Sequence, residues 1–325
     1  TDINTVIFPA GDGAVSLRPL IFEEFNGTVV PAGWASFPWT GGISTLSGGQ
    51  VTVSGARLNT VPATVTYGPG TIMEFRAALG ADQYQNIGLG GGSDLTTNDG
   101  IYWGQTPWAT FSTYNTSTTL YARVFNGSVS ENHAITGLTM PIGGTFTFRI
   151  DWRVDGRFEF FVDNVLVYTS TNSISSGMRP AVSDYNNSGG TLTVDWIKLT
   201  PYSSAGTFES RVFDAGETRL WLNALWNASV PAGTSMTVSV RTGDELPLAN
   251  AYSVFASGQP INFSGRYAQY KADFATSDLR YSPLLLDIGL SYSDLVLSGP
   301  EITKQPSDQV VGEGSQVFFS SWASG

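Results

Sequence analysis

The segment from Phe146 to Tyr168 constrains the fold of this chain more than any other stretch. Apolar and polar residues alternate along it with the two-residue period of a β-strand, which predicts three short strands. The dipeptides Asp155-Gly156 and Asp163-Asn164 separate these strands. Asp, Asn and Gly tolerate the positive φ values that tight hairpin turns require. We therefore expect consecutive antiparallel hairpins here.

The composition favours strands along the whole chain. Charged residues make up only 13% of the 325 residues, about half the share of an ordinary soluble domain. Gly, Ser, Thr and aromatic residues take their place, whereas the residues that build long helices are scarce. Strand-like runs recur at a spacing of roughly ten to fifteen residues, which is typical of antiparallel sandwiches.

Charge and cysteine content exclude several functions. The net charge of −11 argues against nucleic acid, which needs a basic surface. The chain has no cysteine, so disulfides, thiolate metal sites and cysteine nucleophiles are excluded. No apolar run reaches the roughly 18 residues of a membrane span. An acidic, polar chain of this kind is common among exported bacterial proteins, so we expect an extracellular or cell-surface location, with plain solubility as the alternative reading.

The hairpin segment is followed by Met178–Asp184 and by Gly190–Tyr202, which contains the run Val194-Asp-Trp-Ile-Lys-Leu. Taken together, residues 21–202 resemble the concanavalin A-like (laminin G-like) jelly rolls. The resemblance implies a jelly-roll sandwich. Members of that group include glycan-binding modules, adhesion modules and some glycosidases.

Three further regions complete the predicted organisation. Residues 1–20 form an N-terminal arm with one strand at 5–9, and residues 203–293 resemble a β-sandwich repeat of large bacterial exported proteins. Residues 294–325 resemble the opening of a bacterial immunoglobulin-like domain. The predicted fold class is therefore all-β: a jelly-roll sandwich, a second smaller β-sandwich and a partial immunoglobulin-like strand pair. Such a pair is marginal alone, so we expect either a segment of a longer protein or a tail completed by another chain.

Aromatic residues cluster in one short stretch of the first domain. Sugar sites combine aromatic faces with planar polar groups, and residues 101–108 supply both within eight positions. Core packing is the alternative for any single aromatic side chain. The predicted glycan-binding residues are Tyr102, Trp103, Gln105 and Trp108.

A Gly-rich loop next to this cluster carries oxygen ligands that suit a hard cation. Calcium is a possible cofactor there, because the related jelly rolls often bind it, and residues 184–187 are a second candidate. Turn-forming Asx residues are the alternative reading. The predicted calcium ligands are Asp94, Asn98 and Asp99.

The sequence carries no recognised catalytic motif, and we expect a protein that is not an enzyme. Jelly-roll glycosidases of the laminarinase kind carry Glu-x-Asp-x-x-Glu on one strand, and no such run occurs here. The single histidine, His133, lies in an expected loop without a Gly-x-Ser-x-Gly elbow elsewhere.

Two functions follow from these features. The first is a non-catalytic, glycan-binding or adhesive region of a bacterial surface or secreted protein, with a polysaccharide or glycan as partner. The alternative is a structural subunit of an extracellular filament, sheath or surface layer. In that alternative, residues 5–9 of one chain would complete the tail strands at 309–320 of the next by strand exchange, a form of self-association.

Overall fold

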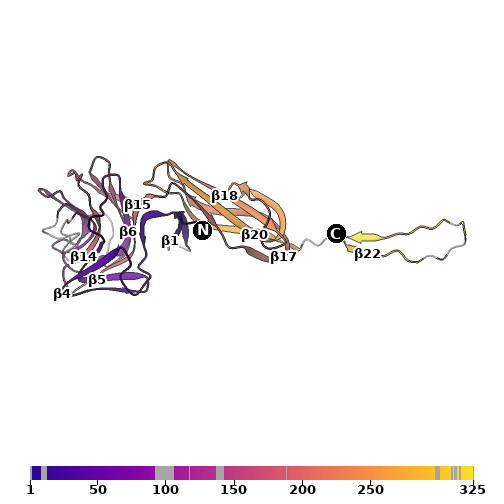
Figure 1. Cartoon of the computed structure of the whole chain (residues 1–325), viewed down its shortest axis with the longest axis horizontal. Helices are drawn as coiled ribbons and strands as arrows, with labels where there is room; N and C mark the ends of the chain where they lie inside the picture. Colours follow the sequence, from indigo (N-terminus) through magenta and orange to yellow (C-terminus); the bar gives the residue numbers. More distant parts are fainter. Residues whose placement is uncertain are drawn as a thin grey trace. The chain divides into compact units, whose positions relative to one another are not determined.

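The chain divides into two compact units in the computed structural model (Figure 1). The jelly-roll unit comprises Arg18–Ser203 and Leu279–Tyr281, and the second unit comprises Thr1–Leu17, Ser204–Asp278 and Ser282–Gly325. The described residues contain strands and turns but no helix, and hence no helical membrane span. The structure describes residues 2–8, 13–91, 106–116, 118–136, 143–187, 189–296, 301–308, 310, 313–314 and 316–324.

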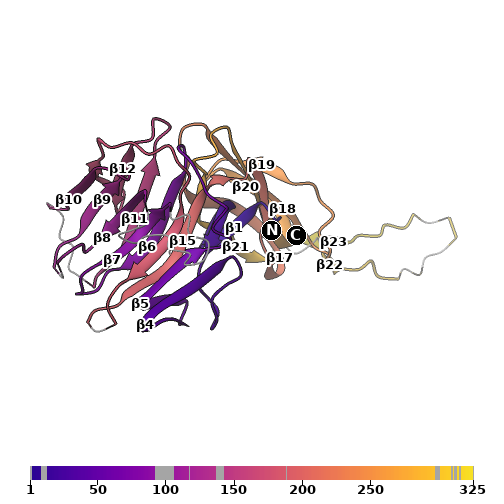
Figure 2. The same cartoon turned by 60° about the vertical axis from the view of Figure 1, so that its left-hand side comes forward.

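The strands of the jelly-roll unit are β3 (Pro19–Glu23), β4 (Trp34–Ser47), β5 (Gln50–Thr60), β6 (Ile72–Ala78), β7 (Gln85–Gly90), β8 (Trp108–Ser112), β9 (Tyr121–Phe125), β10 (Ser130–Ala134), β11 (Thr145–Trp152), β12 (Phe158–Val162), β13 (Val165–Thr169), β14 (Arg179–Asp184) and β15 (Leu192–Tyr202). Among the described residues they form one 13-stranded hydrogen-bonded sheet (Figure 2). Its order is β10-β9-β8-β7-β14-β5-β15-β6-β11-β12-β13, with β3 beside β15 and β4 beside β5. This arrangement is a jelly-roll sandwich, and the predicted fold class is confirmed.

Strand β5 links the two layers of the sandwich. Residues Val51–Val53 pair with β15, whereas Ala56–Asn59 pair with β14. Gly55 lies between these halves with a φ of 56°, a left-handed conformation that favours glycine. A Cβ at this position would lie 2.8 Å from the Cβ of Asn187. Glycine is therefore required here by both conformation and space.

The core between the layers is aromatic. The ring centroids of Phe111 on β8 and Phe148 on β11 lie 4.7 Å apart, and Phe75 on β6 stacks on Phe148 at 5.4 Å. Trp152 is also fully buried, and its Nε1 donates a hydrogen bond of 3.0 Å to the carbonyl of Ile174. Because side chains alternate along a strand, this core determines which residues point to the opposite face.

The predicted triple-strand segment is confirmed as β11, β12 and β13. Val162 and Val165 are cross-strand partners, so only Asp163 and Asn164 form the turn between them. Their φ values are 45° and 65°, as a type I′ turn requires. Gly156, in the other turn, has a φ of 85°.

The second unit contains β1 (Thr5–Phe8), β2 (Ala14–Leu17), β16 (Ala205–Glu209), β17 (Phe213–Ser229), β18 (Thr234–Gly243), β19 (Ser253–Phe255), β20 (Pro260–Thr276) and β21 (Leu284–Val296). Within the described chain they form one eight-stranded sheet in the order β1-β2-β21-β17-β20-β18-β19, with β16 beside β20. Its buried residues include Trp221, whose Nε1 donates to the carbonyl of Gly265 at 2.9 Å.

The N-terminal residues are part of this second sheet. Strand β1 pairs with β2, and Val15 of β2 pairs with Leu285 of β21. Asp2 also forms two hydrogen bonds with Thr207. The backbone N–H of Asp2 donates to the carbonyl of Thr207 at 3.1 Å, and the backbone N–H of Thr207 donates to Oδ2 of Asp2 at 2.9 Å. The residues expected to form a separate arm at 1–20 thus include two strands that pair within their own chain. The strand at 5–9, which the strand-exchange hypothesis assigned to the tail of another chain, already has a partner in β2.

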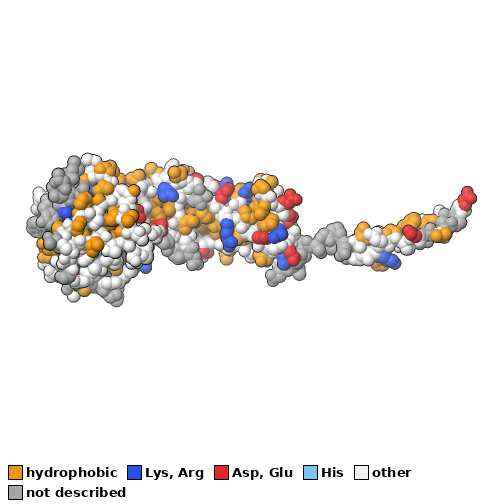
Figure 3. Space-filling view, turned by 60° about the horizontal axis from the view of Figure 1, so that its bottom comes forward, with side chains coloured by type: hydrophobic (Ala, Val, Ile, Leu, Met, Phe, Trp, Pro, Cys, Tyr) orange, Lys and Arg blue, Asp and Glu red, His pale blue; other side chains and the backbone are white. Residues whose placement is uncertain are grey.

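The C-terminal segment forms a short strand pair, β22 (Glu301–Lys304) with β23 (Trp322–Ser324). Residues Gln316–Phe319, which were expected to form a strand, do not form one. Phe318 and Phe319 are 82% and 65% exposed, and hydrophobic side chains recur along this segment in the space-filling view (Figure 3). A strand pattern without a layer to pack against does not form a stable sheet.

Candidate functional site

One layer of the jelly roll has a face that points away from the aromatic core. Ile87, Leu89, Phe111, Ala122 and Val182 lie in the core, so their neighbours in sequence point outward. We call the outward set of β14, β7, β8 and β9 the polar face. It consists of Asn86, Gly88, Gly90, Trp108, Thr110, Ser112, Tyr121, Arg123, Phe125, Arg179, Ala181 and Ser183.

Small residues occupy the centre of the polar face. Ala181, Gly88, Thr110 and Arg123 are successive cross-strand partners from β14 to β9. A Cβ on Gly88 would lie 2.3 Å from the carbonyl oxygen of Ala109, so no larger residue fits there. The long side chains of this face therefore stand on either side of a centre of small residues.

Arg179 is the first residue of β14, and its side chain is fully buried. Its Nη1 donates a hydrogen bond to the carbonyl of Thr60. Among the residues that the structure describes, its Nε and Nη2 have no hydrogen-bond partner. Burial lowers the pKa of Arg179 from its usual value, but a guanidinium keeps its charge in proteins. The face therefore contains an enclosed positive charge with two unused donors.

Arg123, on β9, is a second buried guanidinium. Its Nε donates to Oδ1 of Asn132 at 2.6 Å and its Nη1 to Oγ of Ser112 at 3.4 Å. The group lies over two rings, 4.7 Å from the centroid of Trp108 and 3.9 Å from that of Tyr114. Burial lowers the pKa of Arg123 to about 10, so the group is protonated at neutral pH.

Three aromatic residues form what we call the aromatic cluster, beyond the other end of β14. The ring of Tyr185 lies edge-on to Trp39 at 5.4 Å and to Tyr84 at 6.2 Å. The guanidinium of Arg57 lies 4.9 Å from the Trp39 ring. Tyr185 is 54% exposed and Tyr84 41%. Exposed rings beside a cation and polar donors suit a ligand with both apolar and polar faces.

The polar face is rich in hydrogen-bond donors, but nine of its twelve residues are buried and only Asn86, Tyr121 and Phe125 are partly exposed. None of its twelve residues is Asp or Glu. Arginine, asparagine, serine and threonine offer hydrogen bonds to hydroxyl and anionic oxygens. The pair of carboxylates that retaining glycosidases hold about 5 Å apart does not occur among these positions.

Trp108 is the one predicted glycan-binding residue that the structure describes. It is 5% exposed, packs against Phe125 at 5.5 Å and is covered by Arg123. The prediction of an open sugar platform on Trp108 is therefore corrected: its ring holds Arg123. The other predicted site residues lie outside the described residues, namely Tyr102, Trp103, Gln105, Asp94, Asn98 and Asp99.

The second calcium candidate, residues 184–187, has a different arrangement. Asp184 is fully buried and accepts a hydrogen bond of 3.1 Å from Nε2 of Gln85. Asn186 donates to Oδ1 of Asp82 at 2.8 Å. Within the described ranges, no group of three or more His, Cys, Asp or Glu side chains could hold a metal ion. Burial, and secondly the charge of Asp82, raise the pKa of Asp184 to about 7, although the bond from Gln85 lowers it.

Asp184→Asn is expected to stabilise the protein at pH 8 and to have little effect at pH 4. The folded state of the wild type holds a proton that the unfolded state releases, so its stability falls as the pH rises from about 4 to about 7. The asparagine does not ionise, and it removes a penalty on the order of a few kcal/mol, since each pKa unit corresponds to 1.36 kcal/mol. Thermal melts in EDTA at both pH values measure this. A variant less stable than the wild type at pH 8 would refute the assignment.

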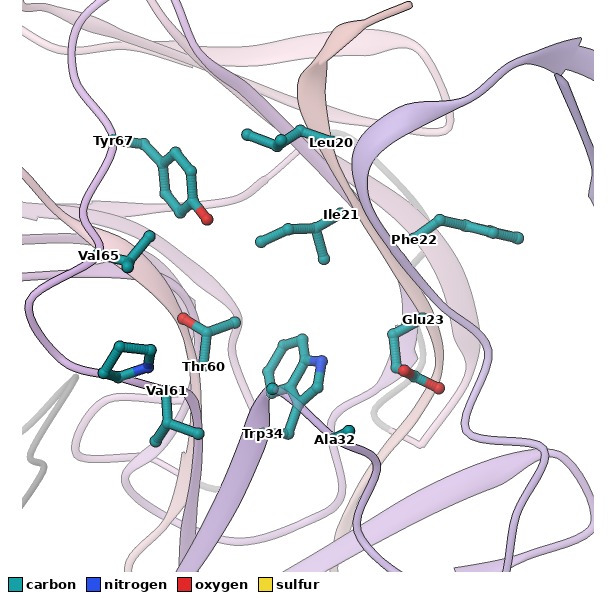
Figure 4. A pocket seen from close by; sticks show the side chains of 12 residues that line it. Leu20, Ile21, Phe22, Glu23, Ala32, Trp34, Thr60, Val61, Val65 and Tyr67 are labelled. Carbon is teal, nitrogen blue, oxygen red and sulfur yellow. The ribbon is translucent and has the colours of Figure 1, made fainter. Parts of the chain in front are cut away.

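A pocket of about 310 Å³ lies on another part of the same unit, between β3 and residues 60–67 (Figure 4). Leu20, Ile21 and Trp34 contribute apolar walls, and the hydroxyl of Tyr67 points toward Ile21 and Thr60. Burial raises the pKa of Tyr67. This volume is at the lower end of the range for small-molecule sites. The polar face, with its length and its donors, remains the better candidate for a chain-like ligand.

Comparison with known proteins finds likeness at the level of structure. No protein-family model matches the sequence, and no curated protein matches it. An endo-β-1,3-glucanase from Pyrococcus furiosus is 12% identical, with a TM-score of 0.43 over 60% of this chain and 97% of that one. β-Agarase A from Zobellia galactanivorans is 12% identical, with a TM-score of 0.39 over 58% and 93%. The carbohydrate recognition domain of Emp47p is 15% identical, with a TM-score of 0.40 over 55% and 92%.

These comparisons contradict the prediction that the chain is not an enzyme. The similar structures named for an activity are glucanases and agarases. The prediction of a non-catalytic adhesive region, and its filament alternative, are withdrawn. The prediction that the chain is not an enzyme rested on the lack of a Glu-x-Asp-x-x-Glu run and of a Gly-x-Ser-x-Gly elbow, and each of these motifs tests only one arrangement of catalytic groups.

Proposed function

We propose that the jelly-roll unit binds a polysaccharide chain along its polar face. The observation that carries this proposal is the exposed pair of rings, Tyr185 and Tyr84, beside a largely buried row of hydrogen-bond donors. Aromatic rings contact the apolar faces of sugars, while Arg, Asn, Ser and Thr bind hydroxyl groups. From Arg179 to Tyr185 the backbone of β14 covers roughly 20 Å, which is long enough for several sugar rings.

We also propose that this protein works outside the cell. An acidic chain without cysteine supports that location. The resemblance of residues 203–293 to an exported bacterial repeat, and of the tail to the opening of an immunoglobulin-like domain, supports it as well. Under this proposal the second unit is one module of an exported protein.

Tyr185→Ala is expected to weaken polysaccharide binding by about tenfold, equivalent to 1.4 kcal/mol. Its ring is 54% exposed and lies against the rings of Trp39 and Tyr84, so the fold should tolerate the change. The full chain is titrated calorimetrically with laminarin and with agarose, the polysaccharide classes named for the similar structures.

Tyr292→Ala is the control, because Tyr292 is an exposed tyrosine of the second unit. It should bind like the wild type. Reducing ends released in the same samples test whether a bound chain is cut. The proposal fails if no polysaccharide binds, or if Tyr185→Ala binds as tightly as the wild type.

A further inference from the structure

The unused donors of Arg179 lie on one edge of its guanidinium group. Nη1 donates to the carbonyl of Thr60, whereas Nε and Nη2 have no hydrogen-bond partner within the described part of the chain. Nε and Nη2 point in parallel and together match the two oxygens of a carboxylate. The free edge is therefore the one that arginine uses for bidentate binding of an anion.

Another arginine of this chain binds a carboxylate through its Nε and Nη2 edge. In the second unit, Nε and Nη2 of Arg266 donate to the two carboxylate oxygens of Asp214 at 2.8 and 2.9 Å. That pair is exposed to solvent, where an unpaired arginine would lose little. Arg179 is fully buried, yet its equivalent edge is free.

A buried charge without a counterion is unfavourable. Removing one partner from a buried ion pair strongly destabilises proteins, and buried donors without acceptors add to this. Apolar residues of similar size would relieve both penalties at position 179. The presence of arginine at this position is explained if a ligand supplies the anion.

The charge around Arg179 agrees with an anionic ligand. Arg123 lies on the same face, Arg57 borders it at the aromatic cluster, and the twelve positions of the face include no acid. The whole chain nevertheless carries a net charge of −11, so it repels polyanions in general. Binding of a polyanion would have to come from a local positive site such as this one.

We infer that the glycan bound on the polar face is acidic, and that a carboxylate or sulfate group of the sugar binds the Nε and Nη2 edge of Arg179. This inference rests on the proposed function. The hydroxyl oxygen of Thr110 is buried and has no hydrogen-bond partner among the described residues, so it is available to a hydroxyl of the same ligand. Because Arg179 is fully buried, a ligand reaches this edge only in a conformation that exposes it.

Matched polysaccharides test the inference on the full chain. Hydroxyethyl cellulose, carboxymethyl cellulose and cellulose sulfate share one backbone, as do dextran, carboxymethyl dextran and dextran sulfate. We expect one acidic member of a set to bind at least about tenfold more tightly than its neutral member. The carboxymethyl and sulfate members show which anion is preferred. The preference should weaken with added salt.

Variants assign the preference to Arg179. Arg179→Met should remove it, and Arg179→Lys, which keeps the charge but not the fork, should keep a reduced preference. Arg266→Met is the matched control and should leave it unchanged. Equal binding of neutral and acidic members by the wild type overturns the inference but leaves the proposed function intact. An acidic preference that survives in a folded Arg179→Met protein also overturns it. If the wild type binds none of these polysaccharides, and neither laminarin nor agarose, both the inference about Arg179 and the proposed function are overturned.

Discussion

Arg179→Met is expected to raise the melting temperature of the jelly-roll unit without any ligand. The substitution replaces a buried, uncompensated guanidinium by an apolar side chain of similar length. The carbonyl of Thr60 loses one hydrogen bond, which costs about 1 kcal/mol. Replacing buried ion pairs by well-packed apolar residues has stabilised other proteins by about 1–4 kcal/mol. For a unit of this size we expect a rise of roughly 2–8 °C.

Differential scanning calorimetry of the full chain measures this effect. Arg266→Met serves as the comparison, because it removes an exposed ion pair, which contributes at most about 1 kcal/mol. A binding residue that weakens its own fold is a known compromise between stability and function. A clear drop in melting temperature for Arg179→Met would mean that the arginine holds the fold, and the ligand argument would lose its basis.

Trp152→Ala is expected to destabilise the jelly-roll unit by about 3–5 kcal/mol, the usual cost of truncating a buried tryptophan. Its indole is fully buried, stacks on Phe158 at 5.5 Å and donates a hydrogen bond to the carbonyl of Ile174. The variant loses the ring contacts and leaves that carbonyl without its donor. Denaturant unfolding followed by circular dichroism measures the loss.

Trp152→Phe separates the two contributions. It keeps most of the stacking on Phe158 but not the hydrogen bond, so its loss of stability should be intermediate. If Trp152→Ala unfolded at the denaturant concentration of the wild type, the core position of Trp152 would be wrong.

Much of the jelly roll could be predicted because its strands carry their own signals. In β11 and β12 the core residues alternate strictly, and the turn at Asp163-Asn164 has residues suited to positive φ. These signals are local and survive in any context. They predicted the three strands and, through the family resemblance, the sandwich.

The partners of isolated strands could not be predicted in the same way. Nothing between residues 5 and 17 indicates that they pair with Leu285, more than 260 positions away. Likewise, the run at Gln316–Phe319 alternates like a strand but has no layer to pack against in the described chain. Pairing depends on three-dimensional neighbours, which a local pattern does not contain.

The candidate site escaped prediction for a related reason. Arg179 and Thr110 lie on different strands and become neighbours on one face only through β7. Tyr185 falls just beyond β14, in a stretch that reads as a polar turn. Sequence reasoning chose Trp108 because aromatic residues are dense around it, but density does not distinguish a ring that contacts solvent from one that holds Arg123.

The most direct test of the account is the ratio of two affinities, that for the acidic polysaccharide that binds most tightly over that for the neutral polysaccharide of the same set, measured for the wild type and for Arg179→Met. The account predicts a ratio of at least about ten for the wild type and close to one for the variant. The same ratio in both proteins would show that Arg179 does not select the ligand, and would contradict the central claim.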